Sequence, residues 1–127
     1  YTSEAAQRLL NEAARYLGTP YVWGGYSPSG FDCSGFVSYC LTNSGVRNTG
    51  RLTAQGLYNI CTPVSQSEAQ PGDLIFFTGT YDAGEPVTHI GIYVGNGQMI
   101  HCGHPVQYTS INSPYWQSHF YGFGRLN

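Results

Sequence analysis

The stretch GFDCSGFVSYCLT, residues 30–42, decides how the rest of the chain is interpreted. It lies at the end of a segment rich in glycine and proline, residues 20–32, whose composition predicts a loop. Apolar side chains then recur at helical spacing, so we predict a helix from near Asp32 to about Thr42. Cys33 therefore stands at the point where a loop becomes a helix.

This position favours a nucleophilic role for Cys33. The positive end of the helix dipole stabilises a thiolate, and the backbone N–H groups of a first turn are free to form an oxyanion hole. The small neighbours Ser34 and Gly35 let a substrate backbone approach closely. A buried core cysteine is the alternative that stays open, because free cysteines are among the most buried residues.

The elements around this helix predict an α+β fold. We expect an amphipathic helix over residues 3–17, with Ser3 as its N-cap and Gly18 as its stop. A short helix capped by Thr53 is expected over residues 53–60. The predicted strands cover residues 74–77, 89–94, 98–101, 106–111 and 120–126. Helices followed by strands predict an antiparallel sheet packed on the helices.

Two histidines lie on one predicted hairpin. Asn96-Gly97 is a strong turn signal, so His89 and His101 fall on adjacent strands, about three residues out of register. A bulge at Gly95 would bring them onto one face. Each histidine alone is more often structural. Together with a suitably placed thiol, they are candidates for a general base and the group that orients it.

The low charge of the chain excludes several partners. Charged residues make up 9% of the 127 residues, with five arginines, no lysine, seven acids and a formal net charge of -2. This argues against nucleic-acid binding and a polybasic membrane anchor, and no apolar run approaches the roughly 20 residues of a membrane span. The 17 glycines and 11 tyrosines suit an uncharged polar or sugar-peptide ligand.

Four blocks of sequence resemble the NlpC/P60 family of papain-like bacterial cell-wall cysteine peptidases. They are GTPYVWGG (18–25), FDCSGF (31–36), QPGDLIFF (70–77), and VTHIGIYVGNG (87–97) followed by MIH (99–101). The blocks occur in the order of the family and cover nearly the whole chain. The tail from Pro114 onward is similar to the catalytic domain of CwlT-like hydrolases, which is often encoded beside a muramidase domain.

The resemblance implies a compact papain-like α+β fold in which the nucleophile begins a helix packed on a five- to six-stranded antiparallel sheet. Residues 1–127 would form a single catalytic domain. Cys33 would be the nucleophile, His89 the general base and His101 the residue that orients it. The implied reaction is hydrolysis of the γ-D-glutamyl bond to the third residue, meso-diaminopimelate or L-Lys, of peptidoglycan stem peptides.

The resemblance also implies substrate-binding residues. Tyr21 matches the family tyrosine near the oxyanion, while Asp32 and Ser34 match positions that grip the free amine of the first L-Ala. Arg51 lies in a loop that borders the cleft in the family, where it would receive a substrate carboxylate bidentately. A solvated surface arginine is the alternative for Arg51.

Neither a cofactor nor a metal is expected, and the stem peptide is the expected partner of a monomeric enzyme. The family implies an extracellular or cell-wall-associated location in a bacterium. Because the chain begins at Tyr1 without Met, we expect a processed or excised domain, linked to another cell-wall domain such as a muramidase outside this sequence.

Other functions remain open at this point. The cluster of His101, Cys102 and His104 suggests a metal site, although adjacent strand residues face opposite ways. A disulfide-stapled binding module is disfavoured, because Cys33 and Cys40 on one helix would be about 10.5 Å apart. Free thiols are therefore expected. An amidase or acyl-transfer enzyme on the same scaffold, or a non-catalytic cell-wall binding module, would share much of the pattern.

Overall fold

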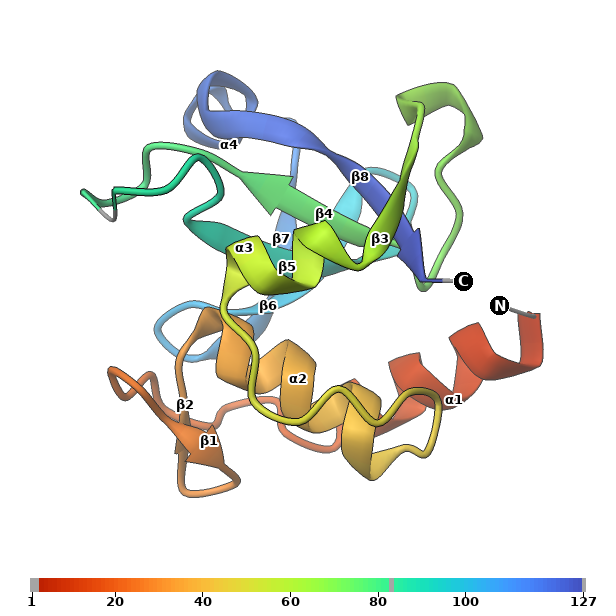
Figure 1. The fold of residues 1–127 in the computed structure, drawn as a ribbon, viewed down its shortest axis with the longest axis vertical. Helices are drawn as coiled ribbons and strands as arrows, with labels where there is room; N and C mark the ends of the chain where they lie inside the picture. Colours follow the sequence, from red (N-terminus) through yellow and green to blue (C-terminus); the bar gives the residue numbers. More distant parts are fainter. Residues whose placement is uncertain (1–2, 83, 127) are drawn as a thin grey trace.

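The computed structural model describes residues 3–82 and 84–126, in which helices pack on a six-stranded sheet (Figure 1). The helices are α1 (Ser3–Ala14), α2 (Cys33–Asn43), α3 (Ala54–Asn59) and α4 (Pro114–His119), with a 3-10 turn at Gln66–Glu68. The strands of the sheet are β3 (Cys61–Val64), β4 (Leu74–Phe77), β5 (His89–Gly95), β6 (Gln98–Cys102), β7 (Val106–Ser110) and β8 (Phe120–Leu126). Their order is β3-β8-β4-β5-β6-β7 and every pair is antiparallel, which confirms the predicted α+β class.

Both faces of the sheet are apolar, and different helices cover them. The cluster on the α2 side includes Phe36, Val37, Leu41, Ile90, Ile92 and Ile100. The cluster on the opposite face consists of Ile75, Phe77, Met99, Ile111 and Phe123, with Trp116 of α4 packed against it. Because side chains alternate along a strand, His89 and His101 belong to this second face while Ile90 and Ile100 face α2. The catalytic candidates on the sheet therefore lie beside α4.

Helix α2 is the buried centre of the fold, with α1 packed beside it (Figure 1). Asp32 caps its N-terminus by accepting a hydrogen bond from the Gly35 backbone N–H at 2.7 Å. Gly35 has to be a glycine, because a Cβ there would lie 1.9 Å from the Gly25 carbonyl oxygen. The Gly25 loop and the first turn of α2 are thus locked together, which fixes the position of Cys33.

Several predicted boundaries differ from the structure, that of the first helix by the most. The first helix ends at Ala14 and not at residue 17, since the following backbone N–H groups of Arg15 and Tyr16 bond three residues back, to Glu12 and Ala13, in a tightened turn. Helix α2 extends one residue beyond the prediction, and β7 ends one residue before it. The other predicted helix and strands differ by at most one residue at each end.

A two-stranded hairpin, one strand and one helix were not predicted from the sequence. The glycine-rich loop contains a two-residue hairpin, β1 (Tyr26–Ser27) with β2 (Gly30–Phe31). Strand β3 is an edge strand interrupted by Pro63, which weakens the pattern of a strand. Helix α4 has only six residues, too few for a periodic pattern, although the Ser113 cap and Pro114 at its start are recognisable signals.

Candidate active site

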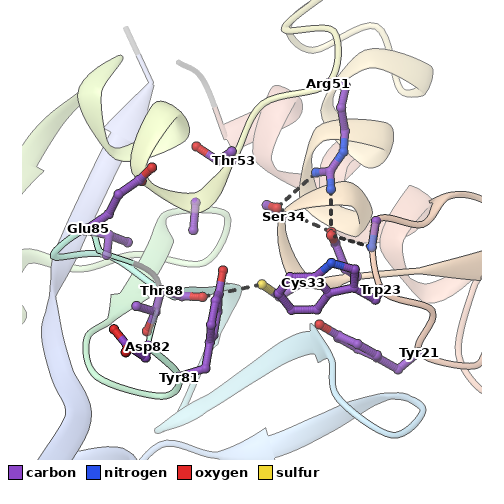
Figure 2. Close-up of a pocket in the computed structure, with 14 residues that line it drawn as sticks. Tyr21, Trp23, Cys33, Ser34, Arg51, Thr53, Tyr81, Asp82, Glu85 and Thr88 are labelled. Carbon is purple, nitrogen blue, oxygen red and sulfur yellow. Dashed lines mark hydrogen bonds and ion pairs between the residues drawn. The ribbon is translucent and has the colours of Figure 1, made fainter.

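Cys33 begins helix α2, and its side chain is 7% exposed. Its Sγ lies 3.8 Å from the carbonyl oxygen of Thr88, the residue that precedes His89 and β5 (Figure 2). Within residues 3–82 and 84–126, Sγ makes no hydrogen bond to the His89 ring. The thiol is therefore held beside the start of β5 and points at its backbone.

The two histidines of the β5–β6 hairpin contact each other. His89 Nε2 lies 2.9 Å from His101 Nδ1, and His101 Nε2 lies 2.8 Å from the hydroxyl of Thr109 on β7. Gly91 makes room for this arrangement, since a Cβ there would lie 2.8 Å from Met99 Sδ and 3.2 Å from His101 Cβ. A chain of three polar side chains thus runs from His89 through His101 to Thr109 of β7.

Aromatic side chains enclose the histidine pair. The Trp116 ring stacks on His89, with centroids 5.2 Å apart and planes 29° apart, and meets His101 edge-on at 5.3 Å. Phe77 lies 6.0 Å from His89 on the neighbouring strand. Sequence analysis did not assign a role to Trp116 or Thr109. Thr109 reaches the site through the register of β7, and Trp116 reaches it through helix α4, which is too short to give a periodic sequence pattern.

Burial dominates the electrostatics of these groups. It lowers the pKa of His89 to about 3, with the neighbouring His101 adding to the shift, and it lowers the pKa of His101 to about 4. Burial also raises the pKa of the Cys33 thiol to about 11, and the carboxylate of Asp32 adds to this shift. Burial thus shifts the pKa of Cys33 in the direction opposite to the one expected from the helix dipole. Both shifts favour the neutral forms, a thiol and an imidazole.

A pocket of about 500 Å³ opens beside Cys33 (Figure 2). Its lining includes all four residues expected to bind substrate, Tyr21, Asp32, Ser34 and Arg51. Burial raises the pKa of Tyr21 to about 12, with Cys33 as the next contribution, so its phenol stays a proton donor at neutral pH. His89 and His101 are not part of this lining. The thiol thus lines the pocket, and the Thr88 carbonyl that it contacts belongs to the residue before His89.

Asp32, Ser34 and Arg51 bond to one another on one wall of the pocket. Arg51 Nη2 lies 2.6 Å from Asp32 Oδ2, and Arg51 Nη1 donates to Ser34 Oγ at 2.9 Å. The side chain of Arg51 is 33% exposed and that of Asp32 is 14% exposed. Arg51 is therefore an exposed residue that an ion pair and a hydrogen bond anchor to the pocket wall.

Other pocket residues received no role from the sequence: Trp23 lies in the quoted block 18–25, whereas Tyr81, Asp82 and Glu85 lie in a loop without a motif. Trp23 is 72% exposed and meets Tyr81 edge-to-face at 5.4 Å, which joins two loops at the pocket. Asp82 and Glu85 lie on the opposite side of Cys33 from Arg51 (Figure 2). The wall formed by Asp82 and Glu85 thus carries carboxylates. The opposite wall carries the Arg51 guanidinium, paired with the carboxylate of Asp32.

The alternative sites of the sequence analysis are not assembled in the part of the chain that the structure describes. There, no three His, Cys, Asp or Glu side chains gather as metal ligands, and the four cysteines are free thiols. His104 packs on Tyr21 with ring centroids 4.9 Å apart. Its neighbour Cys102 points away, toward the Phe31 carbonyl. Across residues 3–82 and 84–126, no helix has both the length and the apolar character needed to cross a bilayer.

Comparisons with known proteins place this geometry in a family. The muramidase/DL-endopeptidase CwlT of Bacillus subtilis is 43% identical over 122 residues, which cover 94% of this chain and 36% of CwlT. The probable endopeptidase p60 of Listeria seeligeri is 47% identical over 119 residues, 93% of this chain and 22% of that protein. This chain thus spans about a third or less of these curated relatives.

Solved structures agree with the sequence comparisons. A Staphylococcus aureus protein described as similar to a lipoprotein of the NLP/P60 family superposes with a TM-score of 0.93 at 42% identity, covering 99% of this chain and 42% of that one. The NlpC/p60 domain of the peptidoglycan hydrolase SagA superposes with a TM-score of 0.76 at 36% identity, covering 94% of this chain and 96% of that domain. A model of the NlpC/P60 family matches residues 18–125, so the chain belongs to the NlpC/P60 family.

Proposed function

We propose that residues 1–127 form a single catalytic domain, a cysteine peptidase that hydrolyses peptidoglycan stem peptides. The observation that supports this most is Cys33, which begins α2, lines a polar pocket and contacts the carbonyl of the residue before the hydrogen-bonded His89. The names of its relatives, a DL-endopeptidase and a probable endopeptidase among them, support the same reaction class.

His89 is the proposed general base and acts through its Nδ1. Its Nε2 is occupied by His101, so Nδ1 is the ring nitrogen left to take the thiol proton. The order of protons that leaves His89 Nδ1 free to act as a base is the one in which His89 Nε2–H donates to His101 Nδ1 and His101 Nε2–H donates to Thr109 Oγ1. In this tautomer His101 positions the His89 ring and stabilises the imidazolium that forms.

Proton transfer accompanies the attack, since thiol and imidazole are both neutral in the free site. The Cys33 thiol first rotates away from the Thr88 carbonyl toward His89 Nδ1. The sulfur then bonds to the scissile carbonyl carbon, and the proton passes to His89. His89 returns this proton to the leaving amine, which breaks the peptide bond and leaves a thioester that water hydrolyses.

The oxyanion formed during the attack would lie at the start of α2. First-turn N–H groups of a helix have no helical acceptor, so the Cys33 N–H is suited to stabilise this charge. The Tyr21 phenol lines the same pocket and stays protonated at neutral pH, which makes it a second donor.

The proposed scissile bond is the γ-D-glutamyl bond to the third residue of the stem, meso-diaminopimelate or L-Lys. The test is mass spectrometry of muropeptides digested by the purified chain and by Cys33→Ala. We expect products cut after D-isoglutamate with the unchanged chain and none with the variant. Undiminished cleavage by Cys33→Ala would contradict the cysteine mechanism, and cleavage at the amide that joins L-Ala to the sugar would identify an amidase instead.

This function places the protein outside the cell or in the bacterial cell wall. CwlT joins an endopeptidase to a muramidase in one protein, and only about a third of it corresponds to this chain. We therefore propose that this domain works beside another cell-wall domain. A monomeric domain acting on the stem peptide needs no cofactor in this mechanism, so activity should survive treatment with a chelator.

A further inference from the structure

Tyr21 presents an unpaired hydroxyl to the pocket. Its side chain lines the pocket together with Cys33, and Figure 2 shows its hydroxyl end turned toward the side on which the thiol lies. Within residues 3–82 and 84–126 this hydroxyl makes no hydrogen bond. The phenol can therefore donate to an oxyanion at Cys33, but no hydrogen bond of the protein fixes its direction. Packing against the ring has to do so.

The backbone around Tyr21 is anchored on two sides. Tyr21 forms a parallel bridge with Phe31, just before helix α2. Two backbone hydrogen bonds of 3.0 Å each join the preceding residues, Gly18 and Thr19, to Val106 at the start of β7. The start of β7 is thus held beside the segment that carries Tyr21. The rotation of the Tyr21 side chain remains to be fixed.

His104 supplies a ring contact to the Tyr21 phenol. The two ring centroids are 4.9 Å apart and the planes are tilted by 43°. In the described part of the chain, this is the one aromatic ring that contacts Tyr21, which otherwise packs against the core cluster around α2. His104 is exposed and, among the same residues, makes no hydrogen bond. The contact with Tyr21 is therefore what its side chain contributes to the fold.

The connection between β6 and β7 gives His104 a fixed starting point. A Cβ at Gly103 would lie 3.2 Å from His101 Cε1 and 3.3 Å from Gln107 Nε2, so the backbone there is closely packed. The Gln107 side chain also donates to the Pro105 carbonyl at 3.0 Å. This short connection thus touches His101 on one side and, through His104, the Tyr21 ring on the other.

We propose that His104 is a positioning residue for the reaction, whose ring holds the Tyr21 phenol where the hydroxyl can donate to the oxyanion formed at Cys33. The inference rests on the proposed function. A phenol without this contact spends part of its time turned away from Cys33, which weakens stabilisation of the transition state but not the binding of substrate. Loss of the His104 ring should therefore lower kcat and leave KM nearly unchanged.

The experiment is a double-mutant cycle of His104→Ala and Tyr21→Phe, measured by hydrolysis of a synthetic stem tetrapeptide, L-Ala-γ-D-Glu-L-Lys-D-Ala or its meso-diaminopimelate counterpart. Tyr21→Phe keeps the ring but removes the donor, so kcat should fall by about tenfold or more. His104→Ala alone should lower kcat about fivefold, and in the Tyr21→Phe background it should lower kcat less than about twofold. His104→Phe keeps a ring against Tyr21 and should recover most of the rate.

Acylation of Cys33 by 4-nitrophenyl acetate provides a second readout that does not depend on recognition of a peptide. The sulfur bonds to the acetyl carbon, the thiol proton passes to His89, and 4-nitrophenolate leaves with the electrons of the broken C–O bond. The same kind of oxyanion forms at Cys33, so the burst of nitrophenolate should slow in the same pattern across the cycle. Cys33→Ala should show no burst.

Tyr108→Ala is the matched control, because Tyr108 is an exposed ring of β7 outside the pocket lining, and it should leave both rates unchanged. Thermal unfolding is measured for each variant, and His104→Gln, which also lacks an aromatic ring of this kind, replaces His104→Ala if that variant unfolds. Equal losses from His104→Ala in both backgrounds, or no recovery in His104→Phe, overturn the proposal. The expected burst pattern without cleavage of any stem peptide would support the role of His104 and contradict the proposed function instead.

Discussion

His89 Nε2 lies 2.9 Å from His101 Nδ1 because the β5–β6 hairpin shifts its register between Tyr93 and Gly95. On the turn side of the shift, Gly95 pairs with Gln98. On the other side, the register places His101 opposite Gly91 and on the same face of the sheet as His89. Without the shift, His101 would face the other side of the sheet, since a slip of one residue exchanges the faces. The bulge considered from the sequence is therefore what joins the two rings.

Thr109 should act as a positioning residue for this pair. Thr109→Val removes the acceptor of His101 Nε2–H and leaves a buried N–H unpaired, so we expect kcat to fall about tenfold with little change in KM. Thr109→Ser restores the hydroxyl and should recover most of the rate. Steady-state kinetics on a synthetic stem tetrapeptide, L-Ala-γ-D-Glu-L-Lys-D-Ala or its meso-diaminopimelate counterpart, measures both variants, and full activity of Thr109→Val would refute the role.

The lowered pKa of His89 predicts the acid side of the activity profile. Because burial keeps the imidazole neutral well below its usual pKa of 6.5, the base remains competent in mildly acidic solution. We expect the acid limb of kcat/KM to lie clearly below pH 6.5. An acid limb at or above pH 6.5, measured in buffers of constant ionic strength, would contradict the effect of burial.

Trp116 should sustain this shift by excluding water from His89. Trp116→Leu removes the ring stacked on the imidazole, so the pKa of His89 should rise toward 6.5 and the acid limb should move to higher pH. Trp116→Phe keeps an aromatic ring and should move the limb less. The comparison of the three pH profiles checks this, and coincident acid limbs would assign Trp116 a purely structural role.

The elements that carry strong local signals could be predicted from the sequence. The loop-to-helix junction at Cys33 and the Asn96-Gly97 hairpin identify the nucleophile and the two histidines, which the structure places around one region of the fold. Their catalytic roles, like the single-domain organisation of residues 1–127, stay predictions. The four residues assigned to substrate binding all line one pocket: Tyr21, Asp32 and Ser34 lie in the motifs around Cys33, and Arg51 joins them from a later loop.

The features of the site that could not be predicted from the sequence all depend on tertiary packing. Arg51 and Asp32 are 19 residues apart and meet through a loop without a motif. Neither their ion pair nor the set of hydrogen bonds that the Asp32 carboxylate accepts could therefore be predicted from the sequence. Thr109 reaches His101 through the register of β6 and β7. The pKa of Cys33 was predicted in the wrong direction because local sequence reports the helix dipole but not the depth of burial.

The two buried histidines also predict how stability depends on pH. Their folded-state pKa values lie below those of the unfolded chain, so the unfolded chain binds more protons and stability falls as pH drops below about 6.5. The loss is at most about 1.4 kcal/mol per pH unit for each histidine. Urea unfolding between pH 7 and pH 5 measures it. His101→Asn should reduce the slope, and an unchanged slope in this variant would contradict the assignment.

Gly35 should tolerate no side chain. In Gly35→Ala the new Cβ would lie 1.9 Å from the Gly25 carbonyl oxygen, which is backbone that cannot move without displacing the Asp32 cap. We expect a loss of at least about 1–3 kcal/mol in the free energy of unfolding, the usual cost of overpacking, together with loss of activity. Gly122→Ala is the matched control, because a Cβ there meets nothing within 4 Å. Urea denaturation and peptide hydrolysis of both variants test the prediction, and equal stability of the two would show that the first turn of α2 is not held by this contact.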